Sequence, residues 1–198
     1  VAISTSESAA DSGVFTIDTG NALGGSSGSI NIITGAGAGA SGSILIEAGP
    51  SSEGSGSDIT MQAGASETGT GGSVMLETGK SAAEASGTVR IHTSAATSSG
   101  SVVVQTGKGT DASGSMLLET GDAISASGGV SLKAGTSGAG SGGFVSISAG
   151  NSDAGRGGSV ALKSGASSGG ASGALSLESA TAQMSSGAVK LATGVAEQ

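Results

Sequence analysis

The stretch that decides the predicted fold is residues 42–49, which read GSILIEAG. Its third and fifth positions are apolar, its seventh is a small residue, and glycines stand at both ends. The same eight-residue pattern, with an aliphatic residue or Phe at the two apolar positions, recurs along the chain. Repeats of fixed length are strong evidence for a repetitive architecture, so they are interpreted before any other feature.

Thirteen copies of this octad can be aligned, and a partial copy at residues 1–6 precedes them. Because Val1 stands inside a copy and no polar cap is evident at either end, we expect a segment of a longer or polymeric array. The copies are residues 13–20, 28–35, 42–49, 57–64, 72–79, 87–94, 100–107, 114–121, 128–135, 143–150, 158–165, 173–180 and 187–194.

Apolar and other residues alternate within each copy, which is the pattern of a β-strand with one buried face. The two apolar residues and the small seventh residue are predicted to point inward, so Ile46 and Leu76 are expected in a narrow core. The linkers of Gly, Ser, Ala, Thr and Asp show no helical periodicity. The sequence therefore predicts an all-β protein with short turns between strands.

A strand every 13–15 residues indicates a β-solenoid, predicted as one array over residues 1–198. Turn lengths differ between alternate copies, which favours coils of about 29 residues with two strands each, forming two facing parallel sheets. Coils of about 14.5 residues with one such strand remain an alternative. In either case stacked strands would lie about 4.8 Å apart.

Composition excludes several classes of function. The chain has 40 Gly, 40 Ser, one His, two Phe and no Cys, Tyr or Trp, with a net charge of −8. Nucleic acids and anionic membranes attract basic proteins, so neither is an expected partner. Without clustered acids and bases or aromatic subsites, we predict no enzyme, no small-molecule substrate, no cofactor, and no catalytic, cofactor-binding or metal-binding residues.

Individual residues that could carry chemistry are better explained as surface features. His92 stands at an outward position without identifiable partners, so it is interpreted as a solvated histidine. Glu47 and Glu77 would stack one coil apart with Asp18 nearby, which could hold Ca²⁺ loosely but is better explained as a solvated acidic face. The recurring Thr column at the seventh position is predicted to point inward, which disfavours ice binding.

Three short motifs fit known binding patterns only by chance. Residues 37–42 match the glycine pattern of dinucleotide-binding proteins, but a strand and not a helix follows. Residues 24–28 match Gly-x-Ser-x-Gly, which is unsurprising in a chain so rich in both residues. Residues 150–160 resemble the Ca²⁺-binding nonapeptide repeat, but they supply one Asp and the pattern does not recur.

The recurrent GSVxLxTG-loop pattern resembles the Gly/Ser/Ala-rich β-solenoid repeats of secreted surface proteins in microalgae and related eukaryotic microbes. This resemblance implies an extracellular structural or adhesive role. We therefore predict a stiff rod or filament subunit of a matrix, appendage or adhesive that self-associates head to tail through open solenoid edges. The acidic N-terminal part would then meet the more basic C-terminal part of the next copy. The alternative is a β-solenoid module that binds ice or a polymer surface.

Overall fold

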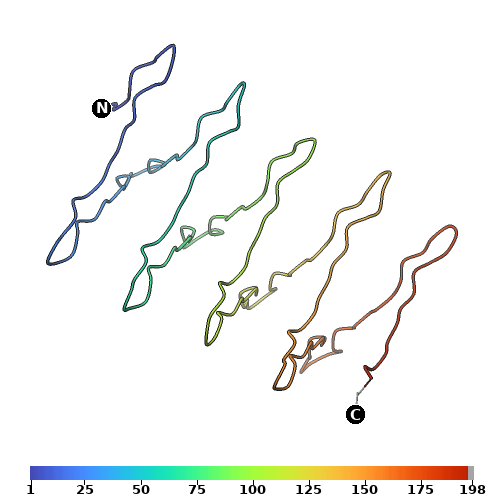
Figure 1. Cartoon of the computed structure of the whole chain (residues 1–198). Helices are drawn as coiled ribbons and strands as arrows, with labels where there is room; N and C mark the ends of the chain where they lie inside the picture. The colour runs from blue at the N-terminus through green and yellow to red at the C-terminus, as the bar shows by residue number, and fades with distance from the viewer. Residues whose placement is uncertain (196–198) are drawn as a thin grey trace. The chain divides into compact units, whose positions relative to one another are not determined.

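The computed structural model describes residues 1–195, and these residues contain no helix and no strand. The chain divides into two units, Val1–Val102 and Val103–Gln198. In each unit the chain alternates between extended stretches and narrow loops, as Figure 1 shows along its colour gradient. The extended stretches correspond to the octads, and the bends lie in the linkers between them.

The prediction of an all-β β-solenoid is wrong, both for coils of about 29 residues and for coils of about 14.5. A β-strand exists only where a neighbouring chain accepts and donates its backbone hydrogen bonds. Within residues 1–195 the backbone–backbone hydrogen bonds all close loops: each joins the last residue of one octad to the first residue of the next, and none pairs the residues between those ends. The octads are therefore extended but unpaired, and no facing sheets form.

The predicted core is absent as well, since no residue from 1 to 195 is buried. Ile46 is 67% exposed and Leu76 is 66% exposed. The physical reason lies in the composition: each octad brings only two or three large apolar side chains, and its Gly/Ser linker brings almost none to cover them. Without a second layer there is nothing against which these side chains can pack.

The alternation of the octad nevertheless remains visible in the degree of exposure. In residues 42–49, Ile44 is 52% exposed and the outward-assigned Leu45 is 80% exposed. Residues assigned outward in other octads, such as Met75 at 81%, are similarly accessible. The pattern therefore sets which face of each extended segment is the apolar one, but that face meets no partner in the described residues.

Candidate functional site

The best-defined local geometry in the structure is the neck of the loops, where the end of one octad meets the start of the next. The glycine that opens an octad lies over the small seventh residue of the preceding one. A Cβ added to Gly143 would lie 3.1 Å from the Ala134 Cβ, and one added to Gly87 would lie 3.1 Å from the Thr78 Cβ. Such contacts are tighter than side chains normally make, so glycine is required there for close approach.

Glycine at these positions does not serve to give the backbone a conformation that other residues avoid. No residue from 1 to 195 has a positive φ, glycines included. The opening glycines are therefore not selected for a left-handed backbone. At the tightest necks, such as those at Gly87 and Gly143, a Cβ would push apart the two segments that the loop brings together.

Six of the loops share one architecture. In each of them, the seventh residue of the octad before the loop lies nine residues ahead of the first residue of the octad after it. These seventh residues are the half-buried positions in the described part of the chain, and all others there are exposed. Small side chains are required at these positions because the neck leaves room for little more than a methyl or hydroxyl group. The six are Ala48, Ala63, Thr78, Ala134, Ala149 and Ser164.

A backbone hydrogen bond closes five of these six loops. In the loop after Ala63, the Gly72 N–H donates to the Gly64 carbonyl at 2.9 Å. The corresponding bond in the loop after Ala149 joins the Gly158 N–H to the Gly150 carbonyl, also at 2.9 Å. Each bond spans eight residues and fixes the neck at the point where the small side chains meet.

A serine then folds the interior of each of the six loops. It stands two residues after the loop's first glycine, and its Oγ accepts a hydrogen bond from the backbone N–H three residues further on. The N···Oγ distances lie between 2.8 and 2.9 Å. The serines are Ser51, Ser66, Ser81, Ser137, Ser152 and Ser167.

The remaining loops close differently. The Thr19 hydroxyl donates to the Gly28 carbonyl at 3.3 Å, and the Thr120 hydroxyl donates to the Gly128 carbonyl at 3.2 Å. In the loop after Thr34, a Cβ on Gly37 would lie 2.5 Å from the Ala40 carbonyl oxygen, so no side chain fits. The glycine motif at residues 37–42 therefore serves loop closure in this structure.

The candidate interaction surface is formed by the apolar faces of the octads. All of their large apolar side chains are exposed, and the total accessible surface is 19720 Å². A compact 18.0 kDa monomer would expose about 8,000 Å², and its fully unfolded chain about 26,000 Å². The chain thus buries only about a quarter of its unfolded surface.

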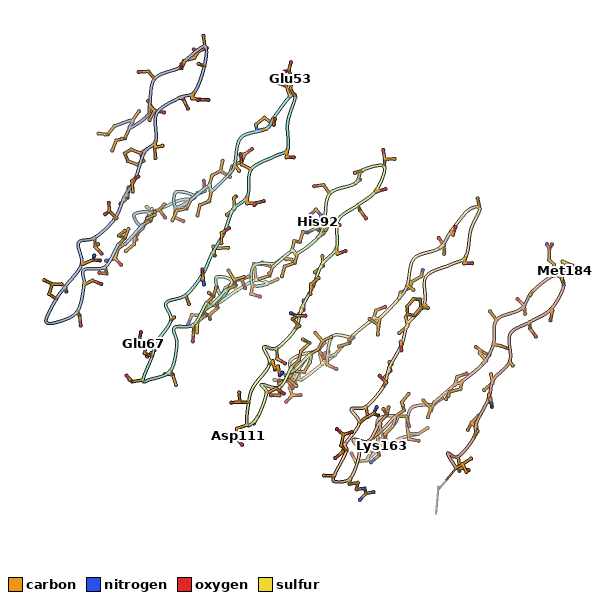
Figure 2. The ribbon with its side chains drawn as sticks, in the orientation of Figure 1. Glu53, Glu67, His92, Asp111, Lys163 and Met184 are labelled. Atoms are coloured by element: carbon orange, nitrogen blue, oxygen red, sulfur yellow. The ribbon has the colours of Figure 1, made fainter. Side chains whose placement is uncertain are left out.

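The residues singled out from the sequence lie apart from one another. His92 is exposed, and its Nδ1 lies 3.3 Å from the Thr93 carbonyl oxygen. Its position is labelled in Figure 2, where the side chains are drawn along the trace. The expected stacking of Glu47 on Glu77 requires stacked coils, which the described residues lack. The segment 150–158 is one of the six serine-containing loops.

No pocket and no group of three or more metal-ligating side chains occurs within the described residues. The same residues include no helix that is both long and apolar enough to cross a membrane. Comparisons with family models, with curated proteins and with solved structures gave no match for this chain.

Sequence reasoning missed the serine-folded loops, although the signal was present. In all six, Gly-x-Ser follows the small seventh residue directly, and a second octad begins nine residues after that small residue. The loops after Ala48, Ala63 and Thr78 are consecutive, as are those after Ala134, Ala149 and Ser164. Loops of this class therefore occur in blocks of three. The prediction of two strands per coil required two kinds of loop in strict alternation, and the blocks do not support it.

Proposed function

We propose that this protein is an extracellular structural protein, a subunit of a matrix, filament or adhesive, that associates with further copies of itself. The observation that carries the proposal is the exposure of the paired apolar residues in all thirteen octads. Apart from the loop-closing bonds between their terminal residues, these octads make no backbone hydrogen bond to one another in residues 1–195. Extended, apolar and unpaired segments are templates for pairing with another chain.

The surface area supports association with copies of the same chain. Relative to a compact protein of the same mass, about 11,000–12,000 Å² of additional surface is exposed. A standard protein–protein interface buries about 1,600 Å² in total, counting both partners. Because the apolar octads are spread along the whole chain, many small contacts with several copies would cover this surface better than one partner of limited size.

This proposal replaces the route to assembly expected from the sequence. Head-to-tail stacking through solenoid ends requires sheets with open edges, and the described residues form none. Self-association itself stays a prediction, now through octads along the chain. The extracellular location rests on the composition and on the resemblance to secreted repeat proteins.

The test is assembly of the purified chain at rising concentration, followed by sedimentation velocity, electron microscopy and fibre diffraction. We expect concentration-dependent filaments or networks with a reflection near 4.7–4.8 Å from paired segments. A chain that stays monomeric at all concentrations would refute the proposal. Location is tested separately by asking whether protease added to intact cells removes an epitope-tagged chain.

Paired variants show whether the apolar octads carry the association. Leu76→Lys with Leu162→Lys places two charges on the apolar faces, and Ala82→Lys with Ala154→Lys places the same two charges in loops. We expect the first pair of substitutions to suppress assembly and the second to leave it close to normal. Equal effects would mean that net charge controls assembly and that the octad faces do not.

The alternative function is binding to ice or to a polymer surface. Ice binding depends on a regular, rigid rank of Thr, and in this structure the hydroxyls of Thr19 and Thr120 are engaged in loop closure. Thermal hysteresis from a monomeric chain would favour that alternative.

A further inference from the structure

The octads share one apolar pattern but differ in the charge at their sixth position. Five octads carry an acidic residue there and two carry a lysine; these residues are Asp18, Glu47, Glu77, Glu119 and Glu178, and Lys133 and Lys163. Residues 1–79 contain eight acidic residues and no Lys or Arg, whereas residues 80–198 contain seven of each sign. Octads of the same shape and opposite charge are therefore present in one chain.

All seven of these charged side chains are exposed, and each follows directly on an exposed apolar residue. Ile46, before Glu47, is 67% exposed, and Leu162, before Lys163, is 61% exposed. A partner segment could therefore cover an apolar side chain and meet the neighbouring charge at the same time. Lys163 is labelled in Figure 2.

The direction of pairing decides whether the opposite charges meet. In a parallel, in-register pair of octads, each position lies beside the same position of its partner, so Glu47 lies beside Lys163 and Ile46 beside Leu162. In an antiparallel pair that still matches the two apolar positions, the sixth position of one octad faces the second position of the other. Glu47 would then face Ser159, and Lys163 would face Ser43. Asp58 is the one acidic residue at a second position, so antiparallel pairs offer the lysines one kind of acidic partner where parallel pairs offer five.

We propose that a second copy of this chain is the partner, and that its lysine octads pair parallel and in register with the glutamate octads of the first. The proposal rests on the self-association argued above and specifies its register. Pairing of two glutamate octads in register would place like charges side by side, which is destabilising. Because each copy carries both kinds of octad, the contact is heterologous and propagates into a filament.

The experiment uses two full-length charge variants and measures the protein concentration at which assembly begins. Asp18→Lys, Glu47→Lys, Glu77→Lys, Glu119→Lys and Glu178→Lys together leave only basic charges at the sixth position, and Lys133→Glu with Lys163→Glu leaves only acidic ones. Each variant alone is expected to need about tenfold more protein than the unmodified chain. An equimolar mixture of the two variants is expected to assemble at close to the original concentration, because opposite charges are again available.

Matched controls carry the same change in net charge on loops. The first variant is matched by five loop substitutions, which are Glu53→Lys, Glu67→Lys, Glu84→Lys, Asp111→Lys and Asp153→Lys. The second is matched by Lys80→Glu with Lys108→Glu; Glu53 and Glu67 lie on loops in Figure 2. The controls are expected to shift the assembly concentration much less than the octad variants do. At 1 M salt, where the Debye length is about 3 Å, the difference between octad variants and unmodified chain should shrink.

The outcomes separate this inference from the function on which it rests. If the unmodified chain assembles but each octad variant assembles alone equally well, the register is wrong and self-association stands. A mixture that fails to assemble, or controls that act as strongly as the octad variants, would also overturn the register. If the unmodified chain does not assemble at all, both the register and the proposed function fail.

Discussion

Replacing Gly143 by alanine tests whether close approach at the neck, and not backbone freedom, explains the glycine that opens an octad. The new Cβ would lie 3.1 Å from the Ala134 Cβ and 3.4 Å from the Gly135 backbone N. One side of the neck must then move by a few tenths of an ångström. The Gly143 N–H donates to the Gly135 carbonyl at 3.0 Å, and that hydrogen bond is the contact that the movement would break.

The magnitude follows from how little holds the neck closed. A backbone hydrogen bond in an exposed loop contributes about 0.5–1.5 kcal/mol net, so its loss changes the closed-to-open ratio by about two- to tenfold. We expect hydrogen exchange of the residue 143 amide, measured by NMR under conditions that keep the chain monomeric, to accelerate by that factor towards the rate of an unprotected amide.

Gly138→Ala in the same loop is the matched control, since a Cβ there meets nothing within 4 Å. Both substitutions remove the same glycine flexibility from the unfolded chain, and neither site has a positive φ, so they differ chiefly in steric contact. Adding Ala134→Gly to Gly143→Ala should restore the protection by removing the opposing methyl group. Equal exchange rates in the Gly143 and Gly138 variants would refute the argument for the neck.

Two further predictions concern the loop interior and the missing core. Ser66→Ala removes the Oγ that accepts a hydrogen bond from the Gly69 N–H at 2.9 Å, so hydrogen exchange of the Gly69 amide should become about two- to tenfold faster. Ser66→Thr keeps a hydroxyl and should retain the protection. Unchanged exchange in the alanine variant would contradict the loop geometry. Ile46→Asp in the monomeric chain should leave the circular dichroism spectrum and its temperature dependence unchanged, because Ile46 is 67% exposed. If the unmodified chain melts cooperatively and the variant does not, Ile46 lies in a core.

The octad pattern predicted part of this structure correctly, because some of its information is local. Extended backbone in residues 42–49 and bends in the linkers follow from alternation and from Gly/Ser composition. The exposure of Ile44 below that of Leu45 also follows from the alternation. Pairing between octads was not predictable in this way, since alternation requires a partner for the apolar face but does not specify which segment, or which molecule, supplies it.

From the sequence, the apolar residues of the octads could be predicted only as a buried core and not as an exposed surface. The same residues, such as Ile46 and Leu76, were assigned to a core, and the structure leaves them exposed. The role of the loop serines, such as Ser137, was not predicted, because Ser is so abundant in this chain that one recurring spacing does not stand out among the other serines. Their role becomes evident only when the hydrogen bond to the N–H three residues later is seen.

Loop geometry and segment pairing therefore make different demands on this chain. The necks need small residues at the ends of the octads, where Ala134 meets Gly143, and they are complete within the chain. The octads need a partner for two apolar side chains and for a row of backbone donors and acceptors, and the described residues provide none. A chain that folds its linkers locally but leaves its extended segments unpaired keeps those octads available to other molecules, and this division is what a subunit that assembles by segment pairing requires.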